Sequence, residues 1–228
     1  MEFAVVQYPP STAADRPAIL VSDFDGTMTQ HDFYRLAIEQ LIPNDCPNFW
    51  AEYRRGRMTH FEALQAYFGA ISASEEAVLT IVNQMQIDPM LPKSLAALRA
   101  AGWQVVVTSA GCKWYIDYLL DRMGVTLEVY ANPGIFISGQ GLRMDLPSDP
   151  QFRSPTVGVD KAGVVAHWLD QGFRVAFAGD GFPDVDAAKL VDGSLRFAKS
   201  DLAEQLQREQ LPFHRFGAWS DIATHLLK

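Results

Sequence analysis

Three apolar runs in this 228-residue chain have the composition of buried strands, and polar residues or glycine follow each of them. The runs cover residues 18–21, 103–108 and 173–178, and segments with apolar residues at helical spacing separate them. Strands that alternate with helices form a parallel sheet with right-handed crossovers, and ligands bind at the carboxyl ends of such strands. The sequence therefore predicts an α/β fold with a functional site at that edge of the sheet.

The segment between the first and second runs has the apolar spacing of helices rather than strands. We expect it to form a small helical cap at 30–88, inserted after the first strand. The core then consists of residues 18–29 and 89–228, and residues 1–17 form a leader that contains several prolines. Expected helices cover 32–42, 59–70, 74–85, 93–100, 112–123, 161–170, 183–191, 200–208 and 220–227, with further strands at 125–130 and 194–198, a hairpin at 134–145 and a loop-rich segment at 146–160.

Charge and composition exclude several classes of protein. The net charge of −8, without a basic patch, argues against binding to nucleic acid or to an anionic membrane. No apolar run approaches the roughly 18–20 residues of a membrane span, and the N-terminus lacks the pattern of a signal peptide. Two cysteines, Cys46 and Cys112, without metal-ligand spacing indicate a reducing compartment, so we expect a cytoplasmic protein in which Cys112 has no catalytic role.

The first apolar run ends in Asp23-Phe24-Asp25-Gly26-Thr27. Two carboxylates one residue apart at the end of a buried strand are poorly suited to packing but suited to phosphate chemistry. Asp23 is the expected nucleophile, which attacks phosphorus and forms an acyl phosphate. Asp25 is the expected general acid, which protonates the leaving oxygen and later activates water, with its pKa raised by like-charge neighbours.

The other two runs supply groups that would hold a phosphate and a cation. Ser109, with the backbone N–H groups of Ala110 and Gly111, is expected to hold phosphate oxygens, and Thr108 is expected to stay in the strand. Lys161 supplies positive charge to the transferring group. A dianionic phosphate repels an aspartate, so a hard cation such as Mg²⁺ is required.

The expected ligands of that cation are Asp23, the backbone carbonyl of Asp25 and Asp180. Asp184 follows Asp180 by one helical turn and is expected to orient a metal-bound water or Lys161.

Taken in order, these motifs resemble those of the haloacid dehalogenase superfamily. The motifs are Asp-x-Asp-Gly-Thr at 23–27, the strand that ends in Ser109, Lys161, and Gly-Asp-x-x-x-Asp at 179–184. The resemblance covers residues 18–228 and implies a Rossmann-like core with a C1-type cap, as in the phosphoserine phosphatase-like group. Within that group, residues 179–190 and 197–198 are similar to the methionine-salvage phosphatases that act on 2-hydroxy-3-keto-5-methylthiopentenyl-1-phosphate. The proline-containing segment at 146–160 departs from that pattern, because the cysteine-rich segment that some of those enzymes carry is absent.

The cap leaves two alternatives open. Asp32 occupies the position at which the phosphoserine phosphatase-like group has a substrate-facing acid, but a carboxylate at a helix N-terminus is an equal alternative. Arg54, Arg55 and Arg57 either hold an anionic substrate or form a solvated helix face. The histidines have no spacing that indicates a metal site, and no feature of the sequence indicates an oligomeric state.

The sequence thus predicts a Mg²⁺-dependent phosphomonoester hydrolase that acts on a small phosphorylated metabolite through a phosphoaspartate at Asp23. A phosphomutase or phosphotransferase would share all of the core residues. A non-catalytic, phosphorylatable switch or binding module is the alternative from another class, although it requires neither the paired carboxylates nor a cap.

Overall fold

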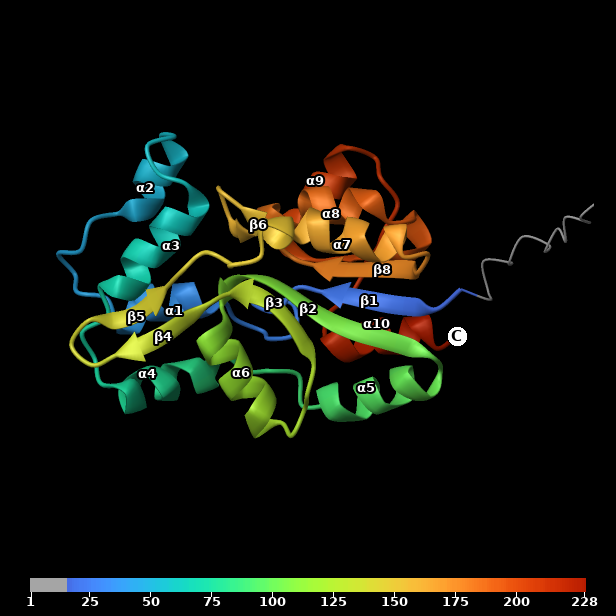
Figure 1. The fold of residues 1–228 in the computed structure, drawn as a ribbon, viewed down its shortest axis with the longest axis horizontal. Coiled ribbons are helices and arrows are strands. Elements are labelled where there is room, and N and C mark those ends of the chain that lie inside the picture. Colours follow the sequence, from blue (N-terminus) through green and yellow to red (C-terminus); the bar gives the residue numbers. More distant parts are fainter. Residues whose placement is uncertain (1–15) are drawn as a thin grey trace, which may run out of the picture.

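Six parallel strands form the central sheet of the computed structural model, which describes residues 16–228 (Figure 1). Their spatial order is β10-β9-β8-β1-β2-β3. The chain runs outward from β1 through β2 to β3, and it then returns to β8 on the other side of β1 and continues to β9 and β10. This confirms the predicted α/β class and parallel sheet. The strands are β1 (Ala18–Ser22), β2 (Trp103–Cys112), β3 (Glu128–Asn132), β8 (Arg174–Gly179), β9 (Arg196–Ala198) and β10 (His214–Arg215).

Helices cover both faces of this sheet, so its central strands are buried on both sides (Figure 1). Ile19 and Val21 point to one face and pack with the cluster that contains residues of α7, α8 and α9. Leu20, between them, belongs to the cluster on the other face, which contains residues of α5, α6 and α10. This double burial explains why the first run is continuously apolar. The helices are α5 (Leu91–Ala100), α6 (Lys113–Arg122), α7 (Lys161–Asp170), α8 (Val185–Leu190), α9 (Ser200–Arg208) and α10 (Trp219–Leu226).

Four helices form the insert between β1 and α5, at the end of the molecule that carries α2 and α3 in Figure 1. The two connections between insert and core pair with each other. The Gln30 N–H donates to the Met85 carbonyl at 3.0 Å, and the Asp88 N–H donates to the Met28 carbonyl at 3.0 Å. These bonds lie next to the boundaries expected for the cap, 30–88, which remain a prediction. The helices are α1 (Phe33–Gln40), α2 (Phe49–Arg54), α3 (His60–Gly69) and α4 (Glu75–Val82), followed by the 3₁₀ turn η2 (Asn83–Met85).

The predicted hairpin is confirmed as β4 (Gly134–Ile137) and β5 (Gly141–Met144). It packs on α3, and the Gln65 side-chain amide donates to the Met144 carbonyl at 2.7 Å. The insert also contacts the core segment before α7, because the Phe61 N–H donates to the Thr156 carbonyl at 2.9 Å. The sequence predicted that both the hairpin and this segment belong to the core. It gave no indication that they also pack against the insert.

Several element boundaries differ from the sequence-based expectation. The second strand continues beyond Thr108 to Cys112, and β3 begins at Glu128 rather than 125. Helix α2 and strand β10 were not predicted. The segment at 146–160 contains a 3₁₀ turn, η3 (Pro150–Phe152), and a two-stranded ladder of β6 (Arg153–Ser154) and β7 (Gly158–Val159). Two further 3₁₀ turns, η4 (Phe182–Asp184) and η5 (Gly193–Leu195), lie next to β8 and β9 in the chain.

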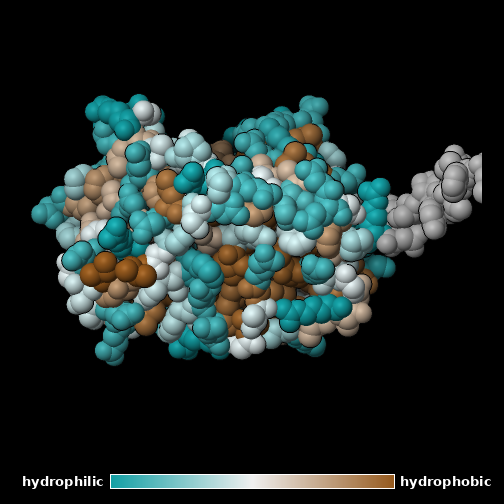
Figure 2. All heavy atoms as spheres, viewed as in Figure 1, coloured by the Kyte–Doolittle hydropathy of each residue, from teal (hydrophilic) through white to brown (hydrophobic). Residues whose placement is uncertain are grey.

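The surface that Figure 2 shows is mostly hydrophilic. Hydrophobic side chains gather over β4, where Ile135 is 57% exposed, and over a larger area between α6 and α5. No helix within residues 16–228 combines the length and apolarity that a membrane crossing requires. Residues 1–15 of the expected leader lie outside the described residues. Its last residue, Pro17, accepts a hydrogen bond from the Arg174 N–H at 2.8 Å and so extends the pairing of β1 with β8.

Candidate active site

A pocket of about 1320 Å³ lies at the carboxyl ends of β1, β2 and β8, with the insert forming one of its walls. This is the edge of a parallel sheet at which ligands bind, beside the strand where the chain reverses its direction of travel across the sheet. The residues to which the sequence assigned catalysis, phosphate binding or metal binding all line it, and so does Asp32. They are Asp23, Asp25, Asp32, Ser109, Ala110, Gly111, Lys161, Asp180 and Asp184.

Lys161 joins two of the carboxylates at the floor of this pocket. Its Nζ lies 2.6 Å from Asp23 Oδ1 and 2.6 Å from Asp184 Oδ1, and all three residues are nearly inaccessible to solvent. Burial alone would lower the pKa of Lys161, but Asp184 and Asp23 raise it above its usual value. The ammonium group therefore stays charged, and it fixes Asp23 relative to the start of α7.

A third carboxylate, that of Asp180, completes a cluster with Asp23 and Asp184, in which one oxygen of each lies within 4.8 Å of the others. Burial, followed by the charge of Asp184, raises the pKa of Asp180 to about 7. Burial and the same charge also raise the pKa of Asp23 well above its usual value, although Lys161 opposes them. One ammonium group does not neutralise three carboxylates, so the site favours an additional cation, and a set of oxygen donors suits Mg²⁺.

The contacts of Asp184 make this carboxylate less available to a cation than those of Asp23 and Asp180. Its Oδ1 binds Lys161, and its Oδ2 accepts the N–H groups of Asp180 at 3.0 Å and Gly181 at 2.9 Å. Both oxygens already have donors, which suits the positioning role expected from the sequence. The Thr27 hydroxyl lies 3.3 Å from Asp23 Oδ2 and 3.5 Å from Asp180 Oδ1, so it links the two expected ligands.

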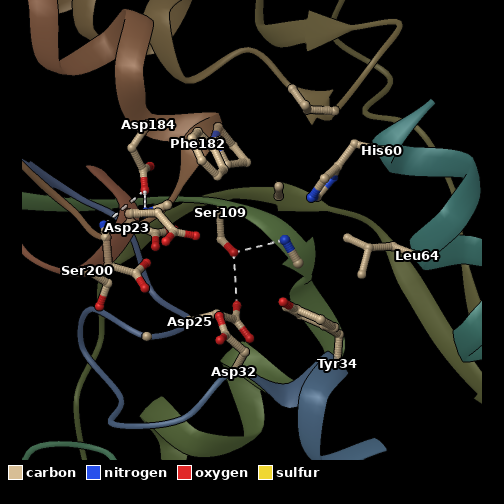
Figure 3. A pocket seen from close by; sticks show the side chains of 18 of the residues that line it. Asp23, Asp25, Asp32, Tyr34, His60, Leu64, Ser109, Phe182, Asp184 and Ser200 are labelled. Carbon is tan, nitrogen blue, oxygen red and sulfur yellow. Dashed lines mark hydrogen bonds between the residues drawn. The ribbon is translucent and has the colours of Figure 1, made fainter. Parts of the chain in front are cut away.

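The Asp25 side chain points to a different set of partners (Figure 3). It accepts hydrogen bonds from the Ser109 hydroxyl at 3.1 Å, the Phe33 N–H at 3.2 Å and the Tyr115 hydroxyl at 2.9 and 3.0 Å. Its pKa is raised to about 6, chiefly by burial and secondarily by Asp32. The expected effect of a like-charge neighbour is therefore present in Asp32, but removal from water, which the sequence did not indicate, raises the pKa more. A carboxyl group with this pKa exchanges a proton near neutral pH.

Ser109, rather than Thr108, faces the pocket. Its hydroxyl donates to Asp25 and accepts the Gly111 N–H at 2.9 Å, whereas the Thr108 hydroxyl is buried and has no hydrogen-bond partner among the described residues. The Asn132 side-chain amide donates to the Ala110 carbonyl at 2.7 Å and holds this segment in place. The expected strand stopped at 108, whereas Ser109, Ala110 and Gly111 belong to the extended carboxyl end of β2.

The wall formed by the insert carries charged and aromatic side chains. Asp32 lines the pocket and pairs with Arg35 at 2.9 Å, and burial raises its pKa. Of the three arginines, Arg54 lines the pocket. Arg55 and Arg57 pair with Glu52 on the exposed surface of the insert, outside the pocket. Tyr34, His60 and Leu64 lie across the pocket from Asp23 and Asp184 (Figure 3).

Sequence reasoning missed Tyr115, His60 and Lys199, which all line the pocket. Burial and the nearby Lys161 lower the pKa of His60 to about 4, so its imidazole is neutral at pH 7. Tyr115 follows Ser109 by six residues in the helix after the second strand, and a polar aromatic residue in that first turn was the available signal. The position of Lys199 follows only from the packing of β9 beside β8, which no local pattern indicates.

Comparisons with known proteins agree with this geometry. The family model of haloacid dehalogenase-like hydrolases matches residues 20–189, a span that includes all three strand ends and Lys161. The chain belongs to the haloacid dehalogenase-like hydrolase family. The predicted family is therefore confirmed, and with it the prediction that the protein is an enzyme.

Members of this hydrolase family that resemble the chain are named as phosphatases. A 2-hydroxy-3-keto-5-methylthiopentenyl-1-phosphate phosphatase from Microcystis aeruginosa is 25% identical over 210 residues, which cover 92% of this chain and 97% of that protein. A polyol phosphate phosphatase from Saccharomyces cerevisiae is 25% identical over 238 residues, covering 92% of each. The resemblance to the methionine-salvage enzymes is thus confirmed as a resemblance, and it is shared with an enzyme named for another substrate.

Solved structures support the fold. A phosphoserine phosphatase structure that contains an analogue of its phospho-aspartyl intermediate superposes with a TM-score of 0.64 at 14% identity, covering 93% of this chain and 100% of that one.

Proposed function

We propose that this hydrolase is a Mg²⁺-dependent phosphomonoesterase that acts on a small phosphorylated metabolite through a phosphoaspartate at Asp23. The observation that carries the proposal is that the two carboxylates of the first motif contact different partners. Asp23 is held by Lys161 at 2.6 Å, beside Asp180 and Asp184, whereas Asp25 turns away toward Ser109 and Tyr115. One carboxylate therefore lies where a cation and an ammonium group support attack, and the other lies where a proton can be delivered.

In this proposal Asp23 attacks phosphorus with one carboxylate oxygen, and the bond from phosphorus to the ester oxygen breaks. Asp25 gives its proton to that departing oxygen and then removes a proton from the water that hydrolyses the acyl phosphate. Lys161 and the N–H groups of Ala110 and Gly111 stabilise charge on the other phosphate oxygens, and Ser109 donates a hydrogen bond to them. A pKa of about 6 suits Asp25 to both proton transfers.

Asp23, Asp180 and the backbone carbonyl of Asp25 would hold the Mg²⁺, which would neutralise the repulsion between the phosphate and the carboxylates. The raised pKa values of Asp23 and Asp180 support this assignment, because burial, followed by the charge of Asp184, makes their ionised forms unfavourable, and a bound cation would stabilise those forms. Asp184 keeps the positioning role, since Lys161 and two backbone N–H groups already occupy its oxygens.

The substrate is proposed as a small phosphorylated metabolite because the insert is small and forms one wall of a pocket whose motif residues suit one phosphate. The methionine-salvage intermediate and a polyol phosphate are the two candidates that the relatives suggest. Asp32 and Arg54 line the pocket on the side of the insert and are proposed to contact the part of the substrate beyond the phosphate. Two free cysteines among the described residues support the further proposal of a reducing, cytoplasmic location.

The test is phosphate release from p-nitrophenyl phosphate with Mg²⁺ and with EDTA. The wild type should release phosphate only with the metal, and Asp23→Asn should abolish release while Asp170→Asn, an exposed change of the same kind at the end of α7, leaves it unchanged. A panel of phosphosugars, polyol phosphates, phosphoserine, pyridoxal phosphate and the methionine-salvage ester should run beside it. Transfer of phosphate to a sugar in preference to water would identify a phosphotransferase instead.

If the wild type released no phosphate from any substrate in that panel, the hydrolase proposal would be contradicted. Stable labelling of Asp23 by a small phosphodonor under the same conditions would then favour the phosphorylatable switch.

A further inference from the structure

Tyr115 makes a contact that the proposed mechanism does not yet use. Its hydroxyl donates to both oxygens of Asp25, at 2.9 Å from Oδ1 and 3.0 Å from Oδ2, and the side chain is only 1% exposed. Tyr115 is the third residue of α6, so it reaches the acid from the helix that directly follows the phosphate-binding segment. A buried tyrosine hydroxyl needs a hydrogen-bond partner. Here that partner is the carboxyl group proposed as the general acid, so the contact can affect the reaction as well as the packing.

The two oxygens of Asp25 differ in their other partners. Oδ1 also faces the Phe33 N–H at 3.2 Å, and a backbone N–H can only donate. Oδ2 faces the Ser109 hydroxyl at 3.1 Å, and a hydroxyl can rotate to accept instead. A proton on Oδ1 would point at a fixed donor, whereas a proton on Oδ2 meets a partner that can adjust. The acidic proton therefore belongs on Oδ2, beside the phosphate-binding segment.

We propose, on the basis of the phosphatase function above, that Tyr115 is a positioning residue. Its hydroxyl, shared between both oxygens of Asp25, fixes the rotation of the carboxyl group, so that Oδ1 stays on the Phe33 N–H and the acid's proton lies on Oδ2, next to Ser109. From Oδ2 the proton passes to the ester oxygen as the phosphorus–oxygen bond breaks, which leaves Asp25 as the carboxylate. The same oxygen then takes a proton from the water whose oxygen bonds to phosphorus, and the Asp23 carboxylate is released. Tyr115 keeps its own proton throughout.

The position of the Tyr115 ring is fixed from two sides. In the insert, the rings of Phe33 and Phe68 lie against it, with centroids 4.7 and 6.3 Å away. In the core, Gly111 leaves the space that the hydroxyl fills, because a Cβ at that position would collide with Tyr115 Oη and lie 2.7 Å from Asp25 Oδ2. The hydroxyl is therefore held between the phosphate-binding segment and the insert, which suits a group that orients its neighbour.

A positioning role and a merely structural role predict different kinetics for Tyr115→Phe, which removes only the hydroxyl. A nitrophenolate ion leaves without a proton, whereas an alkoxide requires one, so a misdirected proton should affect alkyl phosphates selectively. We expect kcat/KM to fall about 10- to 100-fold for an alkyl phosphate and less than about threefold for p-nitrophenyl phosphate, with KM little changed. The alkyl probe is the phosphosugar or polyol phosphate that the wild type hydrolyses fastest.

The ratio of the two kcat/KM values within one preparation does not depend on the fraction of enzyme that is folded, so partial unfolding cannot imitate the effect. Tyr118→Phe is the matched control, because it removes a hydroxyl from the same helix that contacts only Asn83 and Arg122 among the described residues. That variant should keep the wild-type ratio, and Asp25→Asn should show the Tyr115→Phe pattern with larger amplitude.

An equal loss with both substrates, or no loss with either, in Tyr115→Phe would overturn the positioning role while leaving the proposed function intact. A wild type that hydrolyses neither substrate would overturn the proposed function and the positioning role with it.

Discussion

Replacement of Lys161 by methionine should destabilise the metal-free protein severely. The ammonium group lies 2.6 Å from both Asp23 and Asp184, and it is 4% exposed. Removal of one partner from a buried ion pair leaves an uncompensated charge and costs about 3–5 kcal/mol. Lys161→Met would leave two such carboxylates facing each other, so we expect a cost in the upper half of that range at pH 8. In a chain of this size, that free energy corresponds to a fall in Tm of roughly 8–20 °C.

The cost should depend on pH in a defined direction. Burial and Asp184 raise the folded-state pKa of Asp23 above its ordinary value of 3.8, and Lys161 opposes them. Removal of Lys161 should therefore raise that pKa further. A carboxyl group whose pKa is higher in the folded state binds its proton more tightly there, so stability is greatest below the unfolded pKa and is lost as the pH rises through the folded pKa. Lys161→Met should therefore lose less stability at pH 5 than at pH 8.

Urea denaturation in EDTA at the two pH values measures both effects. Lys113→Met is the matched control, because Lys113 pairs with Asp117 at 2.6 Å on an exposed helix face, where such a pair contributes no more than about 0.5 kcal/mol. A cost for Lys161→Met as small as that of the control, or the same cost at pH 5 and pH 8, would refute the claim that a buried cation balances the two carboxylates.

Three further predictions follow from the site. Because the folded-state pKa of Asp180 is about 7, the metal-free wild type should lose stability as the pH rises from 4 to 8, and thermal melts should show a weaker loss in Asp180→Asn or with Mg²⁺. Gly111→Ala should reduce kcat at least about tenfold in steady-state assays, since its Cβ would displace the hydroxyl of Tyr115, and an unchanged kcat would refute that packing. Iodoacetamide should label Cys46 and spare Cys112 by mass spectrometry of the folded protein, because Cys112 is fully buried and burial raises its pKa to about 12.

The elements that carry the site were predictable because their signals are local. Strands buried on both faces are continuously apolar, so 18–21 and 173–178 were visible without a partner. Helix ends were visible where glycine follows, as at Gly102 and Gly124, which adopt φ of +82° and +63°. By contrast, α2 spans six residues and none of its side chains is buried, so it has no apolar stripe to detect. The two-residue β10 exists only because β9 lies beside it.

By itself, the sequence determined the family, the parallel α/β class and the motif residues that meet in the pocket. These follow from chain order and residue type, because the carboxyl ends of parallel strands converge on one edge of the sheet. Only the tertiary structure decided how those residues divide their contacts. Packing turned Asp25 toward Tyr115 and away from the carboxylate cluster, and it placed Lys161 between Asp23 and Asp184. The raised pKa of Asp25 likewise depends mainly on removal from water, which is a property of the whole fold and not of any segment of the chain.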